Sequence, residues 1–235
     1  MNSLNTIQTQ LRDIADPAIA LSSQRFFKTA PGQYGEGDIF LGIKVPTLRA
    51  LAKKFRDTSL NTISALLKSK FHEERLFALM LLINIYQKDN EDSKQSAYDL
   101  YLAHTAHINN WDLVDASAPH IVGDFLASRS RKPLYELVAS TSLWERRIAI
   151  VSTLYFIRHN EFTDTMLIAE HLLADHHDLI HKAVGWMLRE VGKRDQSTEE
   201  AFLQKHYQTM PRTMLRYAIE RFPEMRRKQY LKGKI

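Results

Sequence analysis

Apolar helical runs recur along this chain, and four of them are spaced by about 35 residues. Each has apolar residues at helical spacing, in LRALAKKF, ERLFALMLLINIY, WDLVDASAPHIVGDFLAS, WERRIAIVSTLYFI, HKAVGWMLREVGK and RTMLRYAIERF. When Arg75, Trp111, Arg146 and Lys182 are placed in one register, the separations are 36, 35 and 36 residues, and a fifth unit begins near Leu215. A period in the mid-thirties, with room for a second helix in each unit, predicts a stack of helix pairs.

The repeat predicts an all-α fold, an α-solenoid in which equivalent helices line a concave side. The units lack the Trp/Gly/Tyr pattern of tetratricopeptide repeats, which favours HEAT-like repeats. Composition agrees, because the chain has 44% hydrophobic residues, only 8 Gly and 7 Pro in 235 residues, and almost no strand-like alternation.

We expect a single HEAT-like repeat domain over residues 1–235. The stretch 34–48, YGEGDIFLGIKVPTL, holds three of the eight glycines and a proline, so it is expected to be a loop. It separates N-terminal helices at 1–33 from repeats at 49–222, and a basic C-terminal tail follows at 223–235.

Composition also limits the chemistry and the location. The absence of Cys excludes disulfides, thiolate catalysis and Cys-ligated metal centres, and fits a reducing cytoplasm. No signal peptide or membrane-spanning run is visible, so we expect a cytoplasmic protein with no membrane partner. A net charge of +5 and a pI near 9.3 make an anionic partner plausible. We expect a monomer with no obligate protein partner.

The stretch NNWDLVDA places an indole and two carboxylates at the start of a helical run. Asp112 belongs in the first turn, where a carboxylate caps the helix or faces the positive end of its dipole. Asp115 lies deeper, where Asp is a poor helix former, so it needs a tertiary reason. A salt bridge to Arg146 or Arg147 and a catalytic role are both open on residue types alone.

The repeat register relates this stretch to later units. Since residues four apart share a helix face, Trp111, Asp115, Arg146 or Arg147, Lys182 and Trp186 fall at corresponding positions of successive units. Either Trp could be an ordinary core residue, but an aromatic ring beside charge on a groove wall is also a surface for sugar or base.

Other charged residues have competing interpretations. Arg189, three residues past Trp186, is placed to hold a phosphate bidentately. The basic tail from Arg216 to Ile235 is either a phosphate-binding segment or a solvated terminus. His171, His176, His177 and His181 show no HExxH or other ligand spacing, so no metal site is expected.

Three motifs in order, NNWDLVD, WERRIAI and KAVGWMLREVGK, resemble those of the DNA alkylation repair family of HEAT-like glycosylases, the AlkD type. The segment FFKTAPGQYGEGDIFLGIKVPTLRALAKKF is similar to the N-terminal part of that family as well. The resemblance runs from about Arg25 to about Lys193 and so covers most of the chain.

The resemblance implies that Asp115 is the essential carboxylate and that Trp111 and Trp186 contact the backbone sugars around the lesion. It also implies that Arg147 holds the DNA in a concave basic groove, and we expect Arg146, Arg189, Lys182 and Phe27 to contact DNA too. Tyr155 stands where some members have a Lys that helps to hold DNA, and Phe26 and Phe27 replace a Tyr at the groove rim.

The resemblance further implies a substrate and a reaction. Such enzymes release N3- and N7-alkylated purines from double-stranded DNA without a deep base-flipping pocket. With no imine-forming nucleophile suggested, we expect a monofunctional alkylpurine glycosylase that needs no cofactor or metal and leaves an abasic site. The alternative is a non-catalytic HEAT-like scaffold that binds damaged DNA or protein.

Overall fold

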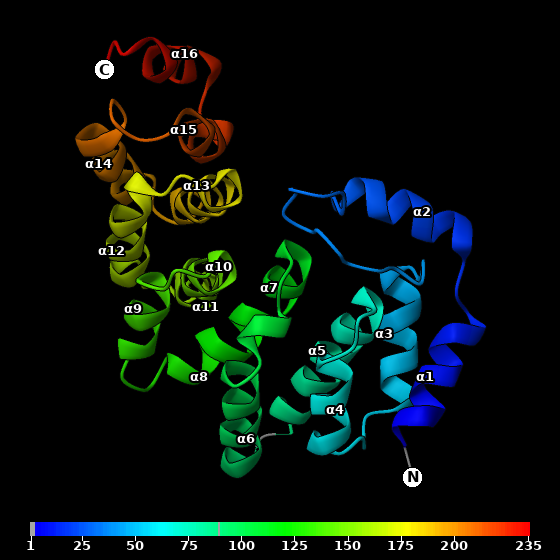
Figure 1. The fold of residues 1–235 in the computed structure, drawn as a ribbon. Helices are drawn as coiled ribbons and strands as arrows, with labels where there is room; N and C mark the ends of the chain where they lie inside the picture. Colours follow the sequence, from blue (N-terminus) through cyan, green and yellow to red (C-terminus); the bar gives the residue numbers. More distant parts are fainter. Residues whose placement is uncertain (1–2, 89) are drawn as a thin grey trace. The chain divides into compact units, whose positions relative to one another are not determined.

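The computed structural model describes residues 3–88 and 90–235, and this part of the chain is all-helical apart from one isolated β-bridge between Ile39 and Phe71 (Figure 1). The chain divides into two compact units, Met1–Ser117 (unit 1) and Ala118–Ile235 (unit 2).

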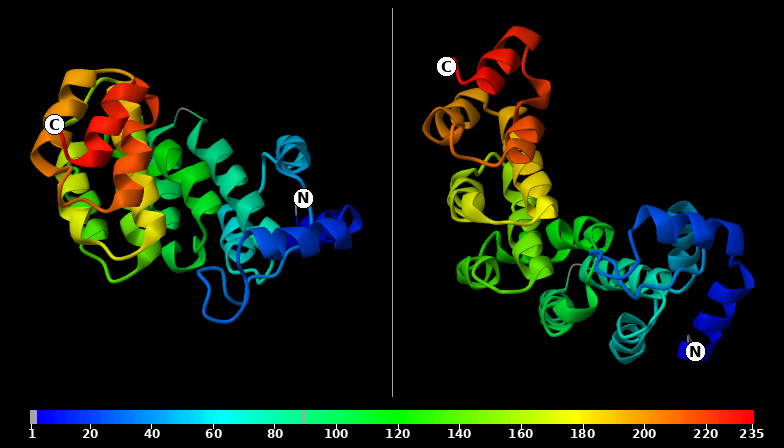
Figure 2. Two further views of the ribbon diagram at one scale, coloured as in Figure 1. Left: turned by 90° about the horizontal axis from the view of Figure 1, so that it is seen from above. Right: turned by 45° about the horizontal axis from the view of Figure 1, so that its top comes forward.

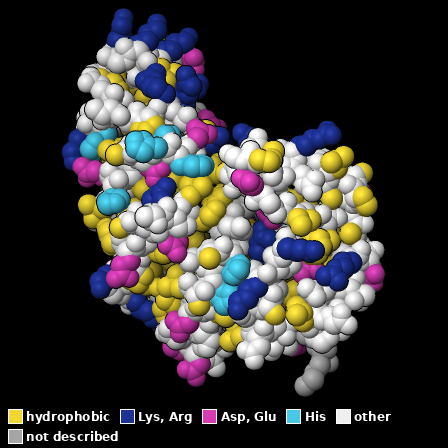
Figure 3. Space-filling model, viewed as in Figure 1, with side chains coloured by type: hydrophobic (Ala, Val, Ile, Leu, Met, Phe, Trp, Pro, Cys, Tyr) yellow, Lys and Arg dark blue, Asp and Glu magenta, His cyan; other side chains and the backbone are white. Residues whose placement is uncertain are grey.

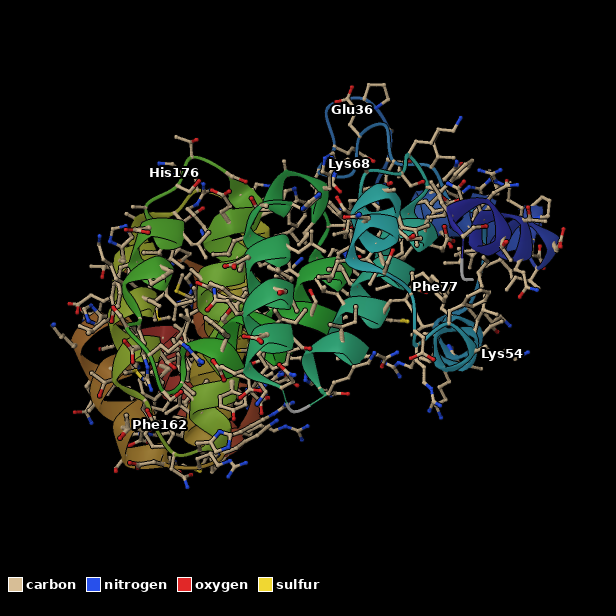
Figure 4. The ribbon with its side chains drawn as sticks, turned by 90° about the horizontal axis from the view of Figure 1, so that it is seen from below. Glu36, Lys54, Lys68, Phe77, Phe162 and His176 are labelled. Atoms are coloured by element: carbon tan, nitrogen blue, oxygen red, sulfur yellow. The ribbon has the colours of Figure 1, made fainter. Side chains whose placement is uncertain are left out.

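Unit 1 contains the elements α1 (Leu4–Asp13), α2 (Pro17–Phe26), α3 (Val45–Lys54), α4 (Leu60–Leu67), α5 (His72–Tyr86), α6 (Glu91–Leu102), the 3₁₀ turn η1 (Thr105–His107) and most of α7 (Trp111–Ala118). Helix α5 lies at its centre and packs against α3, α4 and α6. Phe77 of α5, labelled in Figure 4, is fully buried.

Unit 2 contains the π-helical turn η2 (Pro119–Gly123), α8 (Asp124–Leu126), α9 (Lys132–Val138), α10 (Leu143–Ser152), α11 (Leu154–Arg158), α12 (Thr163–His171), the 3₁₀ turn η3 (Leu172–Ala174), α13 (Asp178–Gly192), α14 (Gln196–His206), α15 (Arg212–Ala218), the 3₁₀ turn η4 (Ile219–Arg221) and α16 (Glu224–Lys232). Within this unit, α10, α13 and α15 form one layer, and α9, α12 and α14 form the other (Figures 1 and 2).

The predicted repeat of helix pairs is confirmed, but the residues aligned in one register do not all occupy the same helix position. Arg75, Arg146 and Leu215 are each the fourth residue of α5, α10 and α15, while Lys182 is the fifth residue of α13 and Trp111 the first of α7. In the order of the chain, α6, α9, α12 and α14 alternate with these helices and supply the second helix of each pair. The protein is therefore an α-solenoid of HEAT-like repeats, built of stacked helix pairs in each unit.

Helix starts follow local capping chemistry. The side chains of the cap residues accept hydrogen bonds from first-turn backbone N–H groups, at Ser3, Asp16, Ser59, Asn90, Ser142, His177 and Asp195. At Pro119 the backbone lacks the N–H that would continue the α-helical ladder, and the helix widens into the π-turn η2.

The loop predicted at 34–48 is present but displaced. The connecting loop, residues 27–44, begins where α2 ends, and Glu36 lies at its tip (Figure 4). Helix α3 already begins at Val45, because Pro46 sits in its first turn, where a missing N–H costs nothing. The loop comes close to α2 at Gly42, where φ is +81° and an added Cβ would lie 2.0 Å from the Asp16 carbonyl oxygen.

The C-terminal tail is structured. Most of it forms α16, anchored by Tyr230, which is fully buried and lies under the Arg226 guanidinium at 5.3 Å. Its Lys and Arg side chains gather at the C-terminal end of unit 2 (Figure 3). Glu224–Lys232 is therefore not frayed, although most of its side chains are exposed to solvent. No helix among the described residues is long and apolar enough to cross a membrane.

Candidate active site

Trp111 forms an aromatic cluster with Phe26, Phe27 and Phe40 at the start of α7. Its ring stacks on Phe27, with centroids 5.4 Å apart and planes at 23°, and Phe26 meets it edge-on at 6.0 Å. The indole Nε1–H donates to the Tyr34 hydroxyl at 3.3 Å. Since Trp111 remains half-buried, these neighbours support a ring that still reaches the surface.

Phe27 and Phe26 have different surroundings. The Phe27 ring stacks on Phe40 at 4.9 Å as well as on Trp111, so its faces are occupied by protein. Phe26 is 65% exposed. Phe26 is therefore the more accessible of the two rings, while Phe27 is half-buried and supports Trp111; contact of Phe27 with DNA stays a prediction.

Asp112 lies in the first turn of α7 as predicted, but its carboxylate is engaged by a residue that the sequence did not single out. His72 Nε2 is 2.7 Å from Asp112 Oδ2, and His72 Nδ1 is 2.8 Å from Asp38 Oδ2. Burial alone would lower the pKa of His72, but its hydrogen bonds to Asp112 and Asp38 and their charges outweigh burial and raise the pKa to about 9. His72 is therefore an imidazolium at neutral pH.

The rest of the His72–Arg75 stretch also binds other elements of unit 1. Glu73 accepts the backbone N–H groups of residues 41, 42 and 43 at 2.8, 2.8 and 3.2 Å. Glu74 accepts the Gln8 side-chain amide at 2.8 Å, and Arg75 donates to Asp38 at 2.7 Å. All four residues are buried, with at most 4% exposure. The sequence could have indicated these buried residues, because four polar residues in a row begin a helix that is otherwise mostly apolar.

Asp115 lies one helical turn after Trp111, and both residues are in α7. It is half-buried, so part of the residue keeps contact with solvent. Its negative charge acts on Tyr101, whose pKa is raised above its usual range mainly by burial and further by Asp115. The predicted shared face of Trp111 and Asp115 follows from this spacing, while the catalytic role of Asp115 stays a prediction.

The two predicted arginines of α10 are held by protein groups in unit 2. Arg146 Nε donates to Asp175 at 2.6 Å, and its Nη1 donates to the backbone carbonyls of residues 140 and 141. Arg147 is 5% exposed and donates to the Leu179 carbonyl at 2.6 Å. Arg146 therefore has a structural partner in Asp175. Contact of Arg146 or Arg147 with DNA stays a prediction.

Helix α13 carries the other predicted residues. Trp186 is half-buried and donates its Nε1–H to Glu190 at 3.1 Å. Arg189 pairs with Glu220 and Glu190, and Lys182 forms a 2.7 Å ion pair with Asp178. A phosphate approaching Arg189 would therefore compete with carboxylates, so its assignment to DNA binding stays a prediction.

Tyr155, which the family resemblance places where some members have a Lys, is engaged by a carboxylate. A hydrogen bond to Asp124, together with burial and the charges of Asp124 and Glu161, raises the pKa of Tyr155 to about 12. This position therefore provides no cation. Among residues 3–88 and 90–235, no group of three or more His, Asp or Glu side chains is placed to hold a metal ion.

The family model for DNA alkylation repair enzymes matches residues 7–222 of the chain. The protein belongs to this family. The match includes Phe27 and the helices α7, α10 and α13, and so covers every predicted site residue. It places the chain among repair enzymes that act on DNA alkylation, without specifying the bond that is broken.

A solved structure agrees on the fold. A predicted DNA alkylation repair enzyme from Enterococcus faecalis superposes with a TM-score of 0.70 and 19% sequence identity, covering 89% of this chain and 97% of that one. At this identity the likeness establishes the fold alone. A search of curated proteins gave no match.

Proposed function

We propose that this protein is a monofunctional DNA glycosylase that hydrolyses the N-glycosidic bond of N3- and N7-alkylated purines in duplex DNA. The observation that carries the proposal is the state of the two carboxylates of α7. Asp115 is half-buried and lies one helical turn after Trp111, a half-buried indole that Phe27 and Tyr34 brace, while Asp112 of the same helix is bound by His72. Membership of a DNA alkylation repair family supports the substrate class.

The chemistry fits these residue types. An N7-alkylated purine carries a positive charge and is already a good leaving group, so little acid catalysis is needed. As the glycosidic bond stretches, positive charge develops on the deoxyribose, and the Asp115 carboxylate stabilises it electrostatically. The same carboxylate orients the attacking water and accepts its proton.

The indoles of Trp111 and Trp186 act on the sugar. An aromatic face attracts a developing oxocarbenium ion by roughly 0.5 to 2 kcal/mol where water is excluded. This attraction is stronger in the transition state than for the neutral sugar, so it contributes to rate. Trp111 is well suited to this role because Phe27 and the Tyr34 hydroxyl hold its ring in place.

DNA binding by unit 2 would use Arg147, Arg189, Arg146 and Lys182 to contact phosphates without reading sequence. Lesion choice then comes from the charge of the leaving group. Lys182 is not proposed as an imine-forming nucleophile, since its ammonium group is paired with Asp178 and such a nucleophile must be a neutral amine. The product is therefore an abasic site in an uncut strand.

Incubation of the purified protein with methylated duplex DNA, without metal or cofactor, tests the proposal. Expected products are free 7-methylguanine and 3-methyladenine, with strand breaks appearing only after alkali treatment. Binding of methylated DNA without base release would favour the non-catalytic damage-binding scaffold. Strand cleavage without alkali would contradict the monofunctional mechanism.

A further inference from the structure

We propose that His72 is a positioning residue, which ties the connecting loop to the first turn of α7 and so holds Trp111 in the aromatic cluster. His72 and its two partners, Asp38 and Asp112, are together called the His72 clasp. The inference rests on the proposed function, because it concerns the geometry of the Trp111 ring and of Asp115 during base excision.

The clasp joins three elements of unit 1. Asp38 belongs to the connecting loop, His72 is the first residue of α5, and Asp112 is the second residue of α7. The side chains of His72 and Asp38 are 2% and 5% exposed and that of Asp112 is 18% exposed. In such surroundings water competes little for the partners of these hydrogen bonds, which are 2.8 and 2.7 Å long.

Only the charged ring can make both bonds. A neutral imidazole has one N–H, so it can donate to one carboxylate and must turn a lone pair toward the other. The charged groups that contact the His72 ring are Asp38 and Asp112, and Arg75 pairs with Asp38 at 2.7 Å. With His72 protonated, two anions meet two cations, and the pKa of about 9 keeps this balance at neutral pH.

The clasp is directly connected to the aromatic cluster. Trp111 and Asp112 are consecutive residues, so fixing the Asp112 carboxylate fixes the backbone that carries the indole. From the other side, the His72 ring stacks on Phe40 at 4.5 Å and lies 5.1 Å from Phe27. Phe27 in turn stacks on Trp111. The clasp therefore controls the indole both through the backbone and through the ring stack.

A pH titration of the wild-type protein followed by NMR tests the proposal without any variant. The Trp111 indole N–H resonance is assigned with Trp111→Phe. The resonance is expected to shift with a midpoint near pH 9, where His72 loses its proton, and the His72 ring resonances are expected to titrate at the same pH. Tyr34→Phe serves as control, because the Tyr34 phenol also contacts the indole, and the titration should persist in that variant.

The His72→Gln variant tests the effect on reaction. It should abolish the Trp111 titration and lower single-turnover base release at neutral pH by about tenfold to 100-fold, the loss expected from a small misplacement of catalytic groups. Affinity for undamaged duplex should change less than about threefold. The matched control is His176→Gln at an exposed His of unit 2 (Figure 4), with no change expected.

The outcomes separate the two proposals. A Trp111 resonance that does not move between pH 7 and 10, or a folded His72→Gln protein with wild-type base release, would overturn the role of His72. If the wild-type protein released no base, the glycosylase proposal would fail, while the titration would still decide whether the clasp positions Trp111. If His72→Gln did not fold, the wild-type titration would decide alone.

Discussion

Glu199 is a carboxyl group held between α13 and α14 with 2% exposure. Its Oε1 finds no hydrogen-bond partner among the described residues, and its side chain lies directly against Gly192. Burial and the neighbouring charge of Glu200 outweigh the attraction of Arg189 and raise the pKa of Glu199 to about 8. Glu199 is a packing residue outside the candidate site. Its raised pKa makes the stability of the protein fall, rather than rise, as pH increases.

The folded protein binds more protons at Glu199 than the unfolded chain does between about pH 4.5 and pH 8, so stability should fall as pH rises through that range. Glu199→Gln keeps the shape of the side chain and removes its titratable carboxyl group. The free energy of unfolding of the variant should exceed that of wild type by on the order of 3 to 5 kcal/mol at pH 9, and by little at pH 4. Urea unfolding at both pH values checks this, with exposed Glu136→Gln as control. An equal gain at both pH values would contradict it.

Single residues also show what sequence reasoning can and cannot identify. Trp111 and Asp115 stand out because an indole and a mid-helix Asp are unusual where they occur. His72, Glu73 and Asp38 do not, because their partners lie 30 or more residues away and only the fold brings them together. The engagement of Arg146 by Asp175 has the same cause, since the pair is separated by 29 residues.

At the scale of elements, close helix packing in unit 2 depends on glycine. A Cβ added at Gly185 of α13 would lie 2.4 Å from the Met214 carbonyl oxygen and 2.5 Å from Tyr217 Cβ on α15. In the same way, a Cβ added at Gly123 of η2 would lie 2.3 Å from the Ser152 carbonyl oxygen. Because these contacts involve backbone, neither site can relax by turning a side chain.

Gly185→Ala should therefore destabilise the protein by about 1 to 3 kcal/mol, as overpacking does. The higher helix propensity of Ala opposes this by up to about 1 kcal/mol and is outweighed. Thermal or urea unfolding measures the difference, and Gln204→Ala at an exposed position of α14 should stay within about 0.5 kcal/mol of wild type. An unchanged or raised stability of Gly185→Ala would show that α13 and α15 are not packed this closely.

The helices themselves were largely predictable, and their boundaries were not. Apolar spacing identifies α10, α13 and α15 because each buries one face against a neighbouring layer. Helix α3 starts at Val45, inside the predicted loop, and α16 forms from a tail rich in charge. In α16 a single buried aromatic residue, Tyr230, provides the anchor, and periodicity gives little signal for one contact.

At the scale of the whole molecule, the sequence predicts the fold class because the 35-residue period is a global property. A concave basic groove is a further prediction that the helix pairing alone does not establish. The charge of +5 is modest, and several predicted cations are paired with carboxylates, as Arg189 is with Glu220. Binding of DNA must therefore draw on a limited number of phosphate contacts.

The salt dependence of duplex binding checks this number. If three to five phosphates are neutralised, the association constant should fall roughly 50- to 500-fold between 50 and 200 mM salt. Titration of a labelled duplex at several salt concentrations gives the slope. A slope near zero would contradict phosphate-based binding and favour a protein partner.

The most direct test of the central claim is single-turnover release of 7-methylguanine by Asp115→Asn. The amide keeps the shape of the side chain and loses the charge that is proposed to stabilise the sugar cation, so release should fall by at least about 100-fold. Affinity for undamaged duplex should remain within about threefold of wild type, and Glu136→Gln should match wild type in both measurements. Release by Asp115→Asn at the wild-type rate would contradict the account.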